Sequence, residues 1–93
     1  MINVNEYFGG AVKSLGYETI AGKSTVGVIA EGTYEFGTSQ PEIMTIMEGE
    51  LQVLLPGATD WVTYTSGQVF EVPAHASFKV TAAAPTAYLC QYR

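Results

Sequence analysis

Residues 41–73 read PEIMTIMEGELQVLLPGATDWVTYTSGQVFEVP, and this stretch determines the fold that the sequence predicts. It contains four runs rich in β-branched and apolar residues, separated by glycine or proline: 42–48, 51–55, 61–65 and 68–72. Gly49-Glu50 and Ser66-Gly67 are typical of turns, so we expect the first run to form a hairpin with the second, and the third with the fourth. Short runs at such regular intervals indicate a small all-β sandwich or barrel.

The rest of the chain continues this pattern and has no convincing helical segment. Further strand-like runs cover residues 11–15, 17–20, 25–30, 33–36, 77–81 and 87–92, whereas residues 1–8 show no clear periodicity. We expect about eight to ten strands in a single domain, residues 1–93, because this length suits one domain. The predicted fold is a closed antiparallel β-structure of the jelly-roll type, since closure removes exposed strand edges.

Composition and charge exclude several functions. Hydrophobic residues make up 47% of the chain and charged residues 14%, which is too apolar for disorder and low in charge for a fully exposed surface. We therefore expect a second subunit to cover some apolar surface. The net charge is −5 and the four cations are dispersed, so DNA or RNA binding is not expected. A single phosphate is different, because one cation and a few backbone N–H groups can hold it.

The single cysteine, Cys90, allows no intrachain disulfide and fits a reducing cytoplasm. The first ten residues, MINVNEYFGG, lack the basic start and long apolar run of a signal peptide. No apolar stretch approaches the roughly 20 residues that a membrane helix needs. We therefore expect a cytoplasmic protein without a membrane partner.

Two local patterns resemble the motifs of cupins. In the second cupin motif five residues separate a glycine from a proline, and Gly67 and Pro73 keep that spacing. His75 stands at a usual glycine position of this motif, and Phe78 stands where a metal-ligand histidine is usual. Aromatic side chains in place of metal ligands suggest a pocket for an organic ligand.

The first cupin motif ends with a glutamate shortly before a glycine, and Glu42 and Gly49 match that order. The two ligand histidines expected upstream fall near Phe36 and Thr38, and neither is a histidine. A site made of Glu42, His75 and water is poor, since catalytic zinc or iron commonly takes two or three histidines and a carboxylate. We expect neither a catalytic metal nor another cofactor.

The ordered combination of short segments along the chain is more specific than either motif. From about Asn5 to Tyr92 the sequence resembles the small single-domain cupins of the pyrimidine/purine nucleoside phosphorylase family. The matching segments are NEYF (5–8), KS (13–14), VGV (26–28), EGTYEF (31–36), LLP (54–56), DW (60–61), FEVP (70–73) and YLCQY (88–92). The resemblance implies a cupin-type jelly-roll β-barrel and reversible phosphorolysis, in which a nucleoside and inorganic phosphate give a free base and ribose 1-phosphate. It also implies broad base tolerance and a homodimer.

Glu42 is the first candidate for a catalytic residue. It can accept hydrogen bonds from ribose hydroxyls or stabilise positive charge on the sugar, because the transition state resembles an oxocarbenium ion. The alternative is that Glu42 only satisfies backbone N–H groups in the loop after Pro41. Lys13 is the candidate for phosphate because it lies in a segment that matches the family pattern. The alternative for Lys13 is a solvated lysine on an edge strand.

Aromatic residues are candidates for base binding, because stacking tolerates every base. The four rings considered are Tyr34, Phe36, Phe78 and Tyr88. For each of them, ordinary barrel core is the alternative. His75 can donate to phosphate or to a base nitrogen, or it is a surface residue of its loop. Thr38 is a further candidate through its hydroxyl.

Two other functions stay open at this stage. The missing histidines and the acidic, sparse charge also permit a non-catalytic cupin that binds a small sugar-like or anionic ligand. The low charge fraction also permits a scaffold or interaction module. A nucleoside phosphorylase differs from both in predicting turnover that depends on phosphate.

Overall fold

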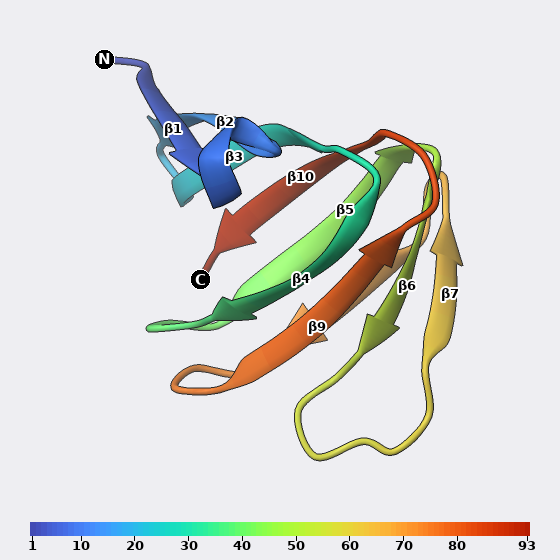
Figure 1. Ribbon diagram of the computed structural model, residues 1–93. Coiled ribbons are helices and arrows are strands. Elements are labelled where there is room, and N and C mark those ends of the chain that lie inside the picture. The colour runs from blue at the N-terminus through green and yellow to red at the C-terminus, as the bar shows by residue number, and fades with distance from the viewer.

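The computed structural model describes residues 1–93 and consists of ten β-strands and one short 3-10 helix (Figure 1). The strands are β1 (Asn3–Tyr7), β2 (Val12–Thr19), β3 (Gly22–Ile29), β4 (Gly32–Gly37), β5 (Glu42–Glu48), β6 (Glu50–Leu54), β7 (Val62–Thr65), β8 (Val69–Val72), β9 (Ser77–Ala82) and β10 (Thr86–Tyr92). The 3-10 helix η1 (Phe8–Gly10) joins β1 to β2. The prediction of an all-β fold is confirmed. No helix in the structure has the length and apolar character to cross a bilayer.

The strands form two antiparallel sheets that face each other across the core. The larger sheet has the order β1-β2-β3-β10-β5-β8, and the smaller sheet has the order β4-β9-β6-β7. Strand pairing does not continue from one sheet into the other, so the barrel expected from the sequence is an open one. Side chains from the inner faces of both sheets fill the space between them.

The two hairpin predictions are wrong. β5 pairs with β10 and β8, whereas β6 pairs with β7 and β9, so β5 and β6 lie in opposite sheets, as do β7 and β8. At Gly49 and Gly67 the backbone φ is 93° and 86°, in the left-handed region that glycine adopts without strain. These residues do bend the chain sharply, but the bend carries it across to the other sheet. A turn signal in the sequence therefore marks the bend without saying which strand the next one pairs with.

The bends at Gly49 and Gly67 lie at one end of the molecule. The Gly67 N–H donates to the Ile46 carbonyl at 2.8 Å, and the Thr86 hydroxyl donates to the Glu50 carbonyl at 3.0 Å. Glu42, at the start of β5, pairs with Tyr92 at the end of β10, so both lie at the other end. These two bends are thus separated from the end that carries Glu42, where the loops after β4 and after β8 also join the two sheets.

The N-terminal strands differ from the prediction in extent. The sequence predicts two short strands on either side of Gly16, but β2 runs through this glycine without a break. Residues 3–7, which show no periodic pattern, form β1 at the edge of the larger sheet, paired only with β2. Pairing with a neighbouring strand supplies the order that the local pattern lacks.

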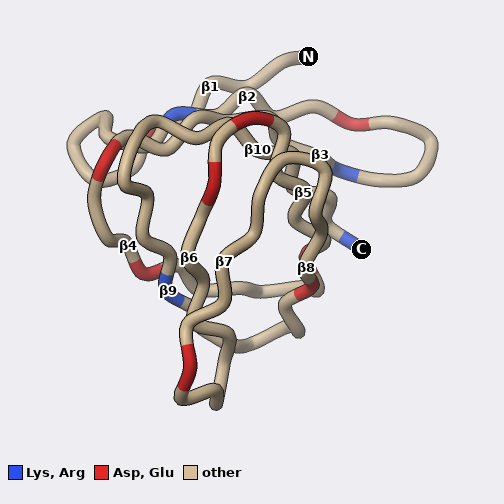
Figure 2. The backbone as a smooth tube through the Cα atoms, turned by 90° about the vertical axis from the view of Figure 1, so that its right-hand side faces the viewer, with Lys and Arg blue, Asp and Glu red and all other residues tan.

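The core lies between the sheets and is built by alternating positions of their strands. Its largest fully buried aliphatic side chains are Ile29, Ile46, Leu51, Val12, Val53, Val72 and Val80. Most charged side chains are exposed. The few cations are scattered along the chain (Figure 2). Glu42 departs from this rule, because it is half-buried beside the core.

Candidate active site

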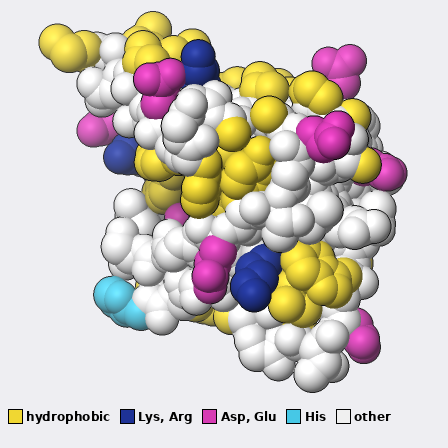
Figure 3. All heavy atoms as spheres, viewed as in Figure 1, with side chains coloured by type: hydrophobic (Ala, Val, Ile, Leu, Met, Phe, Trp, Pro, Cys, Tyr) yellow, Lys and Arg dark blue, Asp and Glu magenta, His cyan; other side chains and the backbone are white.

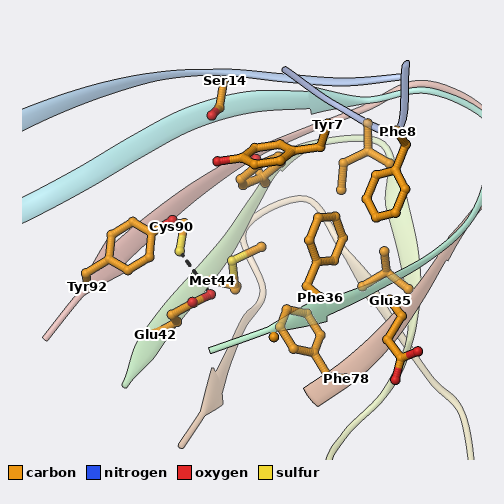
Figure 4. A pocket seen from close by; sticks show the side chains of 14 residues that line it. Tyr7, Phe8, Ser14, Glu35, Phe36, Glu42, Met44, Phe78, Cys90 and Tyr92 are labelled. Carbon is orange, nitrogen blue, oxygen red and sulfur yellow. Dashed lines mark hydrogen bonds between the residues drawn. The ribbon is translucent and has the colours of Figure 1, made fainter. Parts of the chain in front are cut away.

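A cavity of about 300 Å³ lies between the two sheets, beside Glu42 and Tyr92. Ten of its fourteen lining residues are hydrophobic. Hydrophobic side chains are visible in a hollow near the middle of the face in Figure 3. Apart from Glu35 on β4, the polar side chains of the cavity come from the larger sheet, and the phenylalanine rings come from the smaller sheet and η1 (Figure 4). A mainly apolar cavity with a few convergent polar groups is typical of a small-molecule site.

Strand register builds the polar wall of the cavity, which we define as Ser14, Glu42, Tyr88, Cys90 and Tyr92. Alternation along β10 turns Tyr88, Cys90 and Tyr92 to the same, inner face. On the neighbouring strand β5, Glu42 lies opposite Tyr92, and Met44 lies opposite Cys90. The positions of these side chains therefore follow from backbone pairing.

The Glu42 carboxylate is held by its neighbour on β10. The Cys90 thiol donates to Glu42 Oε1, with Sγ and Oε1 3.5 Å apart (Figure 4). Burial raises the pKa of Glu42 above its usual value, and the hydrogen bond from Cys90 opposes part of this rise. A carboxylate in such apolar surroundings gains more from a nearby positive charge than it would in water.

The other acidic groups of the polar wall keep their protons at neutral pH. Burial raises the pKa of Cys90 to about 12, and the charge of Glu42 adds to this rise. Burial likewise raises the pKa of Tyr88 to about 12 and that of Tyr92 further still. The thiol and both phenols are therefore neutral: the thiol donates its one proton to Glu42, and the phenols can donate hydrogen bonds to a ligand.

Tyr88 depends on a glycine in the neighbouring strand. Tyr88 and Gly27 are paired across β10 and β3, and Ser14 pairs with Gly27 on the far side. A Cβ atom at Gly27 would lie 2.6 Å from the Tyr88 hydroxyl and 2.8 Å from the Lys13 carbonyl. The ring of Tyr88 thus lies over the bare backbone of Gly27, with its hydroxyl end toward Ser14.

Three rings form the aromatic wall of the cavity, which we define as Phe8, Phe36 and Phe78. The centroids of Phe36 and Phe78 are 5.8 Å apart, and Phe8 meets Phe36 edge-on at 5.5 Å. Phe8 is half-exposed and has a φ of 54°, which is uncommon for a bulky residue. Its ring closes the side of the cavity nearest to η1 (Figure 4).

Comparison with known proteins agrees with this geometry. The profile of the family described as pyrimidine/purine nucleoside phosphorylase matches residues 2–92. The chain belongs to this family. A protein of Cronobacter sakazakii named pyrimidine/purine nucleoside phosphorylase is 55% identical over 93 residues, which cover 99% of each chain. The resemblance noted in the sequence is confirmed.

Solved structures similar to this family member agree in fold. A crystal structure of a protein of unknown function from Vibrio parahaemolyticus is 45% identical, covers 100% of this chain and 99% of its own, and has a TM-score of 0.97. An RmlC-like cupin from Shewanella frigidimarina is 17% identical, covers 99% of this chain and 83% of its own, and has a TM-score of 0.74. The prediction of a cupin-type jelly roll is confirmed.

Four of the eight predicted site residues meet at the cavity of this family member. Glu42 and Tyr88 belong to the polar wall, and Phe36 and Phe78 belong to the aromatic wall. Phe36 and Phe78, which stand at or near the ligand-histidine positions of cupins, pair with each other across β4 and β9. No three His, Cys, Asp or Glu side chains are grouped as a metal site.

Tyr34 and Thr38 lie outside the cavity lining and have structural partners. The Tyr34 ring is buried behind Phe8, and its hydroxyl donates to the carbonyls of Ala30 and Glu31 at 3.0 Å each. The Thr38 hydroxyl donates to the Pro73 carbonyl at 2.7 Å. These bonds anchor the two loops in place, and a role in substrate binding stays a prediction for both residues.

His75 and Lys13 point away from the cavity. His75 is exposed in the loop before β9, with a φ of 56°, and its N–H donates to the Thr38 carbonyl. Lys13 lies on the outer face of β2 and forms an ion pair with Glu6, with Nζ and Oε1 3.3 Å apart. Neither side chain therefore lines the cavity beside Glu42.

Several cavity residues were missed by sequence reasoning. Cys90 and Tyr92 alternate with Tyr88 along the strand and so share its face, which means that alternation from the candidate Tyr88 leads to both. Ser14 and Phe8 carry no such signal. Ser14 lies at the cavity because β2 pairs with β3 so that Ser14 is opposite Gly27. Phe8 lies there because of the unusual positive φ of its backbone in η1.

Proposed function

We propose that this protein is a nucleoside phosphorylase that cleaves purine and pyrimidine ribonucleosides with inorganic phosphate. The observation that carries the proposal is the half-buried Glu42 carboxylate facing an aromatic wall across one cavity. A nucleoside has the matching parts, a sugar rich in hydroxyls and a planar base. The family of the chain and the name of its Cronobacter sakazakii relative support the same activity.

In the proposed complex the sugar lies against the polar wall. Tyr88 and Tyr92 donate hydrogen bonds to its oxygens, since both phenols keep their protons. When the glycosidic bond weakens, positive charge develops on the sugar, and the Glu42 carboxylate stabilises it more strongly than it would in water. The Cys90 thiol keeps the carboxylate directed along the inner face.

The base lies against the aromatic wall. Phe8, Phe36 and Phe78 offer ring faces and edges without a fixed pattern of donors and acceptors. Stacking discriminates weakly between bases, because every base has a π-face. This wall therefore supports broad specificity for purine and pyrimidine nucleosides. Phosphate acts as a co-substrate, and no step of this scheme uses a metal or another cofactor.

The test is release of free base from adenosine, guanosine, uridine and cytidine, with and without phosphate. The proposal expects base and ribose 1-phosphate in equal amounts, only when phosphate is present. No release above a protein-free control from any of the four nucleosides would overturn it. Thermal stabilisation by nucleosides without turnover would instead favour the non-catalytic binding function.

We also propose that the protein is a homodimer. The outer face of the larger sheet carries a row of apolar side chains, including Val4, Leu15, Val28 and Val69, that are about half-exposed or more. Six strands at a spacing of about 4.8 Å give a face about 24 Å wide, close to the roughly 28 Å edge of a square patch of standard size. A second copy of the chain can cover this face, because few charged side chains on it would have to be removed from water.

Leu15→Glu tests the dimer by analytical ultracentrifugation. We expect this variant to sediment as a monomer, whereas Val62→Glu, an equally exposed site on the smaller sheet, leaves a dimer. A monomeric wild type would overturn this part of the proposal and leave the activity untouched.

The buried free thiol of Cys90 is compatible with the proposed cytoplasmic location.

A further inference from the structure

The cavity holds no positive charge to bind phosphate. None of its lining residues is lysine, arginine or histidine. Lys13, the cation singled out in the sequence, is paired with Glu6 on the outer face. A phosphate that enters beside Glu42 therefore needs a cation from elsewhere in the molecule.

Lys23 is the lysine that meets the cavity wall. Its Nζ lies 5.4 Å from the centroid of the Tyr92 ring, and Tyr92 lines the cavity. Along β3, Lys23 has the same parity as Thr25 and Gly27, which are buried on the inner face. In the sequence, Lys23 lies in a segment, residues 21–24, that is typical of a turn. In the structure β3 already begins at Gly22, so Lys23 lies within the strand and its side chain takes the direction of the inner face.

Register sets Lys23 in one cross-strand row with the candidate catalytic residue. Lys23 pairs with Glu18 on one side, and because Ser24 pairs with Gln91, Tyr92 is the next residue beside Lys23 on the other. Tyr92 in turn pairs with Glu42. Lys23 and Glu42 are therefore two strands apart, so their backbones are separated by about 10 Å.

We propose that Lys23 binds the phosphate co-substrate at the open end of the inner face, across Tyr92 from Glu42. This inference rests on the proposed function and adds its anion site. The Lys23 amine lies 5.4 Å from the centroid of the Tyr92 ring, and Tyr92 pairs with Glu42 on its other side, so a phosphate bound to the amine would lie across this ring from a sugar held at Glu42. An attacking oxygen and the anomeric carbon can then approach each other along the row.

The surroundings of Lys23 leave it free for an anion. Lys23 forms no ion pair, although Glu18 is its direct cross-strand neighbour. It also borders a polar hollow of about 410 Å³, where Asn3 and Tyr17 offer further hydrogen-bond donors and Glu18 is the one carboxylate. Phosphate has room there to shed part of its hydration without losing all its hydrogen bonds.

Arg93 fixes this end of the sheet through backbone carbonyls. Its guanidinium donates through Nη1 to the carbonyls of Lys23 and Tyr92, at 2.9 and 2.8 Å. These bonds tie the end of β10 to the start of β3. Arg93 is thus a positioning residue for Lys23.

In the proposed reaction Lys23 contributes only its positive charge. A phosphate oxygen forms a bond to the anomeric carbon while the bond from that carbon to the base nitrogen breaks. The electron pair of the broken bond leaves with the base, which takes a proton from water. Lys23 neither gains nor loses a proton, and its charge offsets that of the phosphate near Glu42.

Steady-state kinetics of Lys23→Met, with Lys13→Met as a matched control, test the proposal. Both lysines are exposed and lie on adjacent strands of the same sheet. We expect Lys23→Met to raise the KM for phosphate at least tenfold while the KM for the nucleoside changes less than twofold. Lys13→Met leaves both constants unchanged, and Lys23→Arg recovers part of the phosphate affinity. Equal KM values for phosphate in Lys23→Met and wild type would overturn the assignment.

Calorimetric titration with inorganic phosphate alone, at constant ionic strength, separates this inference from the proposed function. Wild type and Lys13→Met bind phosphate, and Lys23→Met binds it at least tenfold more weakly. If no nucleoside is cleaved but this difference persists, the proposed function fails and the anion site stands. If wild type binds no phosphate, or all three proteins bind it equally, the anion site is overturned.

Discussion

The two walls of the cavity are built by different means. The polar wall is fixed by backbone pairing, since β5 and β10 set Glu42 beside Tyr92 and Cys90 at their register positions. The aromatic wall depends on contacts between rings, and Phe8 reaches it from η1 at the edge of the larger sheet. Under the proposed function, we expect the polar wall to be the more rigid side that performs the chemistry and the aromatic wall to be a softer side that accommodates different bases.

The largest effect should come from the rigid wall. We expect Glu42→Gln to lower kcat by about 100-fold or more, because a preorganised charge near the transition state is lost. The control is Glu71→Gln, an exposed site on the outer face of neighbouring β8, which leaves kcat unchanged. Wild-type turnover in Glu42→Gln would show that the polar wall acts through other groups.

The same variant tests the burial of Glu42 through the pH dependence of stability. Because burial raises the folded-state pKa of Glu42, the folded protein binds this proton more tightly than the unfolded chain does. This contribution to stability is complete below the usual value of 4.5 and is lost as pH rises through the folded-state pKa. Urea titrations at several pH values should show a flatter profile for Glu42→Gln. An identical profile would contradict the raised pKa.

We expect Gly27→Ala to displace Tyr88 within the polar wall. Its Cβ would crowd the Tyr88 hydroxyl and the Lys13 carbonyl, and crowding of this kind costs typically about 1–3 kcal/mol of stability. Tyr88 would move into the cavity and raise the KM for nucleosides. Gly16→Ala is the matched control, since its Cβ meets no atom closer than 3.5 Å. Thermal unfolding and kinetics of both variants decide whether the two glycines differ.

Substitutions in the aromatic wall should have smaller effects. We expect Phe8→Ala to raise the KM for nucleosides about tenfold, in line with a stacking contribution of about 1–3 kcal/mol per base. Phe8→Gly loses the same ring but also relieves the positive φ, so it should unfold at a higher temperature than Phe8→Ala. If Phe8→Ala leaves every nucleoside KM unchanged, the softer wall does not bind the base.

The smallest change should follow substitution of Cys90 by serine. A serine hydroxyl can keep the hydrogen bond to Glu42, so we expect kcat to change less than threefold and Cys90→Ala to lower it further. With a pKa near 12, the native thiol should also resist alkylation at neutral pH until the chain unfolds. Rapid labelling of the folded protein would contradict this.

The sequence predicted most strands but not how they pair. The extents of β5 and β10 are close to prediction because each alternates or is apolar over its whole length. The bends at Gly49 and Gly67 were recognised, yet both were interpreted as hairpins. Local turn chemistry is the same for a hairpin and for a crossing between sheets, so only long-range packing separates them.

The same limit applies to the candidate site. Glu42 is recognisable because it occupies a position in the first cupin motif, and Phe36 and Phe78 are recognisable because they stand at or near histidine positions of the first and second motifs. Lys23 was missed because its direction depends on the register of β3 with β10, which no local pattern reveals. Lys13 was preferred on its sequence context, although alternation with buried Val12 turns it outward.

The separation of the bends from the cavity has a consequence for how this scaffold can change. The loops at residues 37–41 and 73–76, on the cavity side, are joined through Thr38, whose N–H donates to the Ala76 carbonyl at 2.8 Å. Both loops also carry the chain from one sheet to the other, and lengthening either one would reshape the rim without touching the bends at Gly49 and Gly67 on the far side. New ligand preferences can therefore evolve by insertion into these loops while the bends at Gly49 and Gly67 keep their conformation.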